Sequence, residues 1–180
     1  PLFLIAIIAA FSAGILAQNP DHLSLRLNTT VGTITASGGE SGSTKAAAIR
    51  AIERDAFQMI NVERSLAGLP ALKWNEKVAE LARLHSQNMA DSNFFSHKGL
   101  DGLTVDGRAQ QLNVSWEAIG ENIAFMQNYP NPAQIAVQKW LQSASHRGNM
   151  MDKGWSDSAI GVAMTEDGKW YFTQVFILTK

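Results

Sequence analysis

Cysteine is absent from this sequence of 180 residues. Its absence excludes disulfide bonds, thiol nucleophiles and every metal site that is built from thiolates. A domain without disulfides must be stabilised by the packing of its core, and a chain of this length can bury a core of sufficient size. With 46% hydrophobic and 17% charged residues, the composition is typical of one globular domain.

Clustered basic charge is also missing. The 15 lysine and arginine residues are scattered along the chain, no two of them are adjacent, and the formal net charge is −1. Polyanions are bound by clusters of Lys and Arg. We therefore expect no nucleic-acid partner.

Two common catalytic patterns are missing as well. The chain has no His-Glu-x-x-His sequence, which excludes the usual zincin site, and no Gly-x-Ser-x-Gly nucleophile elbow. Ser143 precedes His146 by three residues, so the two side chains could touch on a helix. Acyl transfer by this pair is kept as an alternative, although no oxyanion loop accompanies it.

The N-terminal segment carries no charge. Residues 1–17 are predominantly apolar and end in Ala17, as a secretory signal peptide does before its cleavage site. We predict a signal peptide at 1–17, truncated at its N-terminus, and a secreted, extracellular protein. The alternative is an N-terminal membrane anchor, for which a spanning helix needs about 20 apolar residues. Residues 18–48 are rich in Ser, Thr and Gly, which predicts a flexible arm.

Helical patterns begin after this arm. Apolar residues at intervals of three and four predict a helix from about Lys45 to Leu66. A second helix is expected after Asn75, which is placed as its N-cap. A short helix is expected near residues 108–112, and Asn131-Pro132 is typical of the start of a further helix.

Strand patterns are concentrated near the C-terminus. A short strand is predicted at 119–125, and two β-rich runs, 159–165 and 169–178, are joined by a turn containing Asp167-Gly168, which indicates a hairpin. Helices followed by an antiparallel hairpin are typical of an α+β fold in which helices cover a small sheet. We assign residues 49–180 to this domain.

Side chains suited to acid–base or metal chemistry occur in three separate segments: Ser96-His97, Gly120-Glu121-Asn122 and His146-Arg147-Gly148-Asn149. Imidazole titrates near neutral pH and is the commonest metal ligand, so His97 and His146 are candidate ligands. His97 lies in a predicted loop, where it either faces a cleft or is simply exposed. His146 follows the helix that carries Trp140 and is expected at its C-terminus, where the helix dipole favours histidine.

The remaining candidates have structural alternatives. Glu121, between Ile119 and Ile123, is expected to be partly buried and to need a cationic or hydrogen-bonding partner, either for chemistry or merely to hold neighbouring loops. Asn122 is expected to link two backbone segments. His85 shares the apolar stripe of its predicted helix, which favours a satisfied core residue.

An ordered set of motifs resembles the CAP domain family, also called SCP-like after sperm-coating and pathogenesis-related-1 proteins, in its cysteine-free bacterial form. The motifs run from about Phe57 to Phe176 and include Asn61-x-x-Arg64, Gly68-Leu69-x-x-Leu72-x-Trp74, Ala82-x-x-His85-Ser86-x-x-Met89, Phe95-Ser96-His97, Arg108, Gly120-Glu121-Asn122, Trp140-x-x-Ser143, His146-Arg147-x-Asn149-Met150, Gly161-Val162 and Gln174-x-Phe176. Each motif is weak alone, whereas their order is specific.

The resemblance implies a three-layer α-β-α sandwich with a central antiparallel sheet. It also implies that His97, Glu121 and His146 face one central cleft, in which relatives bind a divalent cation such as zinc. Eukaryotic members with the full tetrad carry a second glutamate where this chain has Ser143. The tetrad is therefore incomplete here, and the disulfides of those members are missing too.

Two functions follow from this resemblance. The first is a secreted or envelope-associated binding module, whose ligand would be a lipid, a sterol or a cell-wall component. The second is a metal-dependent, peptidase-like hydrolase, in which His97 and His146 hold a zinc ion and Glu121 orients or deprotonates its water. Catalytic zinc usually has three protein ligands, so a site with two imidazoles favours the binding module. Asn122, Ser143 and Arg147 are expected to support the site.

Overall fold

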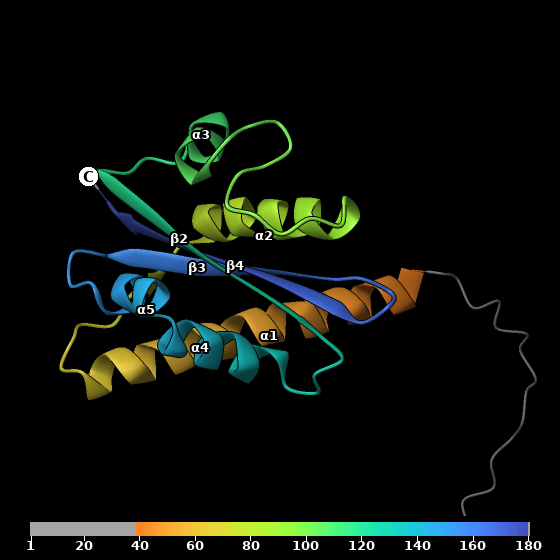
Figure 1. The fold of residues 1–180 in the computed structure, drawn as a ribbon, viewed down its shortest axis with the longest axis horizontal. Coiled ribbons are helices and arrows are strands. Elements are labelled where there is room, and N and C mark those ends of the chain that lie inside the picture. Colours follow the sequence, from red (N-terminus) through yellow and green to blue (C-terminus); the bar gives the residue numbers. More distant parts are fainter. Residues whose placement is uncertain (1–38, 180) are drawn as a thin grey trace, which may run out of the picture. The chain divides into compact units, whose positions relative to one another are not determined.

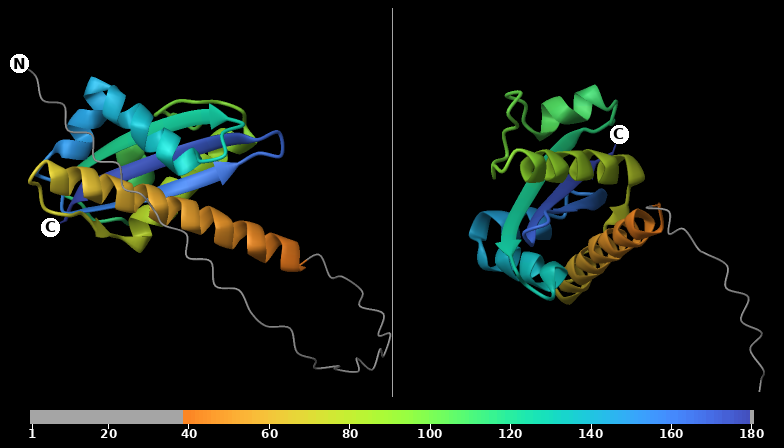
Figure 2. Two further views of the ribbon diagram at one scale, coloured as in Figure 1. Left: turned by 90° about the horizontal axis from the view of Figure 1, so that it is seen from below. Right: turned by 90° about the vertical axis from the view of Figure 1, so that its right-hand side faces the viewer.

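A four-stranded sheet lies between two layers of helices in the computed structural model, which describes residues 39–179 (Figures 1 and 2). Helices α2 and α3 cover one face of the sheet, and α1, α4 and α5 cover the other (Figure 1). The helices are α1 (Gly39–Leu66), α2 (Glu76–Asp91), α3 (Val105–Gln111), α4 (Pro132–Gln142) and α5 (Ala144–Met151). The strands are β1 (Lys73–Trp74), β2 (Ala118–Gln127), β3 (Asp157–Met164) and β4 (Lys169–Leu178). This arrangement confirms the predicted three-layer α+β sandwich.

The sheet has the strand order β1-β3-β4-β2. Strand β4 pairs antiparallel with β3 and with β2, whereas β1 adds two residues in parallel at the outer edge of β3. The predicted hairpin is formed by β3 and β4. Gly168 in its turn has a φ of +78°, a conformation that glycine adopts without steric cost. The β2–β4 pairing brings Glu121 opposite Val175 in the middle of the domain.

Helix α1 begins earlier than the sequence pattern indicated. It starts at Gly39 rather than near Lys45, so residues 39–48, which we expected within the flexible arm, are helical. Residues 39–44 include two glycines, two serines and a threonine, so intrinsic helix propensity does not explain this extension. The predicted signal peptide and the rest of the predicted arm lie outside the described residues.

The predicted start of helix α2 is confirmed. The side chain of Asn75 accepts a hydrogen bond from the Val78 backbone N–H, as an N-cap does. The short third helix starts earlier than predicted, because the Arg108 N–H donates to the Thr104 carbonyl. Asp106 and Gly107 therefore lie in the first turn of α3.

The two helical layers approach the sheet closely. Trp140 of α4 is fully buried, and its indole N–H donates to the Ile123 carbonyl of β2 at 3.0 Å. On the other face, a Cβ atom at Gly161 of β3 would overlap the backbone of Ala82 and Arg83 in α2. Gly161 therefore allows α2 to lie directly on the sheet.

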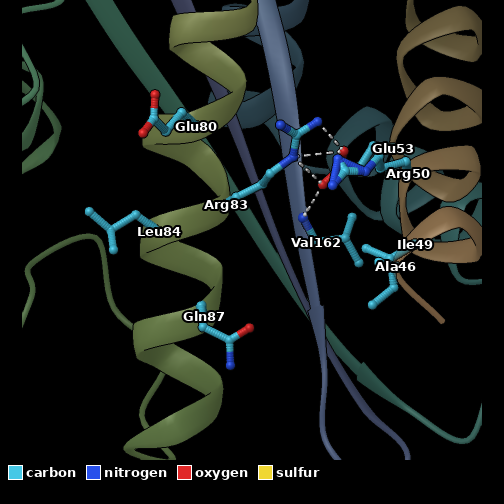
Figure 3. A pocket seen from close by; sticks show the side chains of 9 residues that line it. All are labelled: Ala46, Ile49, Arg50, Glu53, Glu80, Arg83, Leu84, Gln87 and Val162. Atoms are coloured by element: carbon cyan, nitrogen blue, oxygen red, sulfur yellow. Dashed lines mark hydrogen bonds and ion pairs between the residues drawn. The ribbon is translucent and has the colours of Figure 1, made fainter. Parts of the chain in front are cut away.

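A buried ion pair joins the layers along the outer edge of β3 (Figure 3). Glu53 of α1 is only 1% exposed, and its Oε2 lies 2.7 Å from Nη2 of Arg83 in α2. Its Oε1 accepts a hydrogen bond from the Val162 N–H of β3 at 3.2 Å. The bond to Glu53 and the proximity of Glu76 raise the pKa of Arg83 above its ordinary value. One carboxylate thus ties α1, α2 and β3 together and satisfies a strand-edge N–H.

Candidate functional site

Glu121 of β2 is the centre of the candidate site. Its side chain is 4% exposed, and both carboxylate oxygens are engaged. Oε1 lies 2.8 Å from Nδ1 of His97, and Oε2 accepts from Nη2 of Arg108 at 2.5 Å. A carboxylate buried to this extent needs such partners, as the sequence suggested.

His97 projects from the loop between α2 and α3, and 51% of its side chain is exposed. Because Nδ1 faces the carboxylate of Glu121, the hydrogen bond assigns the proton to Nδ1. In the neutral form of the imidazole, Nε2 then carries the lone pair. Carboxylate–histidine pairs of this kind orient the imidazole and raise its basicity as a metal ligand.

Arg108 of α3 is the functional residue that reasoning from residue chemistry missed. It is 3% exposed, and its Nη1 donates to the carbonyls of His97 at 3.1 Å and Leu103 at 2.9 Å. The guanidinium therefore holds both the loop that carries His97 and the carboxylate that orients it. A buried Glu121 implied a cationic partner, but the sequence did not distinguish Arg108 from the other basic residues except through the family motif.

His146 lies beside His97, with 6.5 Å between the two ring centroids. It is in the first turn of α5, because α4 ends at Gln142 and a new helix follows. The expectation that His146 occupies a helix C-terminus is therefore wrong. Its ring has no hydrogen-bond partner among residues 39–179. Burial, and secondarily the charge of His97, lower the pKa of His146, which favours a neutral imidazole at neutral pH.

Asn122 and Asn149 fix α5 against β2. The Asn122 side-chain N–H donates to the His146 carbonyl at 3.1 Å, and its oxygen accepts from the Asn149 side chain at 2.9 Å. Asn149 in turn donates to the Glu121 carbonyl at 3.3 Å. This network positions the helix turn that carries His146 next to the strand that carries Glu121.

The other two predicted supporting residues take no part in this cluster. The Ser143 hydroxyl is paired with the Ser145 hydroxyl at 3.2 Å rather than with His146. Arg147 is exposed on α5, and its guanidinium has no partner within the described part of the chain. The arrangement gives no support to acyl transfer by Ser143 and His146.

His85 is a core residue, as its position on the apolar stripe indicated. It is 1% exposed, and its Nε2 lies 2.9 Å from the Ser96 carbonyl. Its hydrogen bonding is only half satisfied, because Nδ1 has no partner in the described structure. Burial lowers the pKa of His85.

The donor set limits what metal chemistry the site can support. Among the described residues, no group of three or more His, Asp or Glu side chains is arranged to hold a metal ion. His97 and His146 supply two imidazoles, fewer than the three protein ligands that are usual for catalytic zinc. Both carboxylate oxygens of Glu121 are engaged by His97 and Arg108, which leaves Glu121 behind the His97 ring in an orienting position.

The three-layer sandwich is shared with a solved SCP domain. The model of the CAP family, described as the cysteine-rich secretory protein family, matches residues 57–176, and the chain belongs to this family. It is a cysteine-free member.

Bacterial proteins are among its relatives. The chain is 36% identical over 125 residues to the membrane protein YlbC of Bacillus subtilis, covering 69% of this chain and 34% of that protein. It is 32% identical to an SCP-domain extracellular protein of Bacillus anthracis, with a TM-score of 0.61 and coverage of 73% of this chain and 41% of the other. An outer surface protein of Borrelia burgdorferi shares the fold at 19% identity, with a TM-score of 0.62 and coverage of 69% and 90%. The chain thus spans between a third and a half of the Bacillus relatives.

Proposed function

We propose that this chain carries an exported binding module of the cell envelope, with a divalent-cation site formed by His97 and His146. The observation that supports the site is the pair formed by His97 Nδ1 and Glu121 Oε1 at 2.8 Å, which leaves the other ring nitrogen free for a ligand. The His146 ring, whose centroid is 6.5 Å away, provides the second nitrogen. Zinc is the cation that this donor set suits best.

Export is supported by the predicted signal peptide and by relatives described as extracellular, outer-surface or membrane proteins. None of the helices in residues 39–179 has the length and apolar character needed to cross a bilayer. A lipid, a sterol or a cell-wall component remains the proposed ligand class of the module.

The hydrolase alternative requires a carboxylate that can take a proton from a metal-bound water. Both oxygens of Glu121 are already bonded, to His97 and to Arg108. The zinc ion would also have two protein ligands instead of the usual three. We therefore favour binding over hydrolysis and assign Glu121 as a positioning residue.

Calorimetric zinc titration at about pH 7, where unperturbed imidazoles are largely neutral, tests the cation site. We expect His97→Ala and His146→Ala each to abolish zinc binding. Glu121→Gln should weaken it by about tenfold or more, because outer-shell partners typically contribute that much to metal affinity. His22→Ala is the matched control, since it removes a histidine outside the family match and should leave binding unchanged. Unchanged zinc binding in both single-site histidine variants would refute the site.

The same variants separate the two functions. If the protein still binds phosphatidylglycerol vesicles after both histidine substitutions, its lipid- or sterol-binding surface lies elsewhere on the domain. Zinc-dependent peptide cleavage that is lost in His97→Ala would instead favour the hydrolase and overturn our assignment.

A further inference from the structure

The loop that carries His97 is attached to the domain by two buried side chains. Arg108 of α3 donates to the His97 carbonyl at 3.1 Å. The carbonyl of the preceding residue, Ser96, lies 2.9 Å from Nε2 of His85 in α2. Side chains from two different helices therefore hold two consecutive carbonyls of this loop.

His85 reaches the loop from the core. It is 1% exposed, and burial lowers the pKa of its imidazole, which favours the neutral ring at neutral pH. A neutral ring has one N–H, and because Nε2 faces a carbonyl oxygen, Nε2 carries the proton and donates it to Ser96. The ring also lies edge-on to Phe94, with 6.3 Å between the two centroids. His85 thus supports the loop at two positions just before His97.

Histidine has an energetic cost at this core position. Nδ1 of His85 is buried and has no hydrogen-bond partner among residues 39–179. A buried polar atom without a partner lowers the stability of the fold. Leu81, Ala82 and Met89 are buried on the same helix and carry no such atom. The hydrogen bond to Ser96 is therefore what His85 provides and an apolar side chain of similar size would not.

We propose that His85 is a positioning residue for His97. Its hydrogen bond to the Ser96 carbonyl fixes the peptide group that precedes His97, and this directs the imidazole toward Glu121. The His97 ring needs such support because 51% of its side chain is exposed, so that packing alone does not hold it. The inference rests on the proposed function in that His97 is a ligand of the proposed cation site.

The test compares substitutions that remove the donor of His85 with one that keeps it. His85→Phe retains a ring against Phe94, and His85→Met places a flexible apolar side chain in the core; both remove the donor. His85→Gln keeps it, because Nε2 of glutamine is as many bonds from Cβ as Nε2 of histidine. The substitution that removes the donor is judged in whichever of the two variants retains the circular-dichroism spectrum of the wild type.

Ser86→Ala is the matched control. Ser86 is the next residue of α2 and is also fully buried. Its hydroxyl bonds the Gly161 carbonyl and the Thr173 hydroxyl of the sheet, both at 2.9 Å, instead of the loop. Its loss should therefore lower stability without changing the orientation of the His97 ring.

The first measurement is the tautomer of the His97 ring, which ¹⁵N NMR reports without any metal. At about pH 9, well above the ordinary pKa of imidazole, the wild type should carry the proton on Nδ1, which faces Glu121. We expect the same tautomer in His85→Gln and Ser86→Ala, and a mixture of the two tautomers when the donor is removed. The second measurement is calorimetric zinc affinity, which should fall about tenfold only when the donor is removed, as it does when groups that orient a metal ligand are lost.

The proposal is overturned if His97 keeps its Nδ1 proton after the donor of His85 is removed, or if Ser86→Ala changes the tautomer equally. A merely structural role for His85 predicts an unchanged tautomer together with a lower unfolding midpoint. Recovery of the tautomer in His85→Gln assigns the effect to the hydrogen bond rather than to the shape of the ring. Because the tautomer is measured without zinc, a wild type that binds no zinc would refute the cation site and leave the test of His85 valid.

Discussion

The substitution Glu121→Gln tests the electrostatic centre of the candidate site. It keeps the size and shape of the side chain and removes only its charge. Arg108 would then remain 3% exposed with no counter-charge, although it keeps its bonds to the carbonyls of His97 and Leu103. His97 would lose the carboxylate that orients its ring.

The expected loss of stability is about 3 kcal/mol. Removing one partner of a buried ion pair costs about 3–5 kcal/mol, because it leaves an uncompensated buried charge. The lower end applies here, since the glutamine oxygen can still accept a hydrogen bond from Arg108. With a urea m-value of about 2 kcal/mol/M, the midpoint should fall by about 1.5 M.

Urea unfolding followed by tryptophan fluorescence measures this change. Glu117→Gln is the control, because Glu117 is an exposed carboxylate four residues away on the approach to β2, and its loss should stay within about 0.5 kcal/mol. The double substitution Glu121→Leu with Arg108→Met should cost less than the sum of its two single substitutions, by a coupling of about 1–3 kcal/mol. A Glu121→Gln protein as stable as Glu117→Gln, with additive behaviour in the double variant, would refute the buried pair.

Two further predictions concern packing and pH. Gly161→Ala should destabilise the fold by at least about 3 kcal/mol, because the new Cβ meets the backbone of α2. Gly148→Ala in α5, where the space is open, should instead gain about 0.5–1 kcal/mol of stability. Thermal melts of the two variants check this contrast. Burial lowers the pKa of His85 below 6.5, so the unfolded chain takes up the proton first as the pH falls, and stability present at neutral pH is lost below about pH 6.5. His85→Gln should lose less stability than the wild type between about pH 7.5 and about pH 5.5 in urea titrations, and equal losses would contradict the buried neutral ring.

Much of the fold could be predicted from local patterns. Asn75 caps α2, Asn131-Pro132 begins α4, and Asp167-Gly168 turns the β3–β4 hairpin because each of these effects acts within a few residues. The errors occurred where local signals compete. Helix α1 extends back to Gly39 through a stretch rich in Gly and Ser that we had assigned to the arm by its composition.

The candidate site, too, could be predicted from the sequence only in part. The sequence identified His97, Glu121 and His146 by residue type, and the order of the family motifs predicted that they meet. It placed His146 at the end of a helix, whereas a break at Ser143 puts it in the first turn of α5. Asn122 and Asn149 hold α5 against β2 through hydrogen bonds that no local pattern reveals.

By itself, the sequence determined the fold class, the family and the chemical types available, since these follow from periodicity, motif order and composition. Tertiary structure alone decided which charges are paired. Arg108 reaches Glu121, and Arg83 reaches Glu53, across 13 and 30 residues of chain. Such pairs form because burial makes an unpaired charge costly, and burial is a property of the packed sandwich rather than of any segment of it.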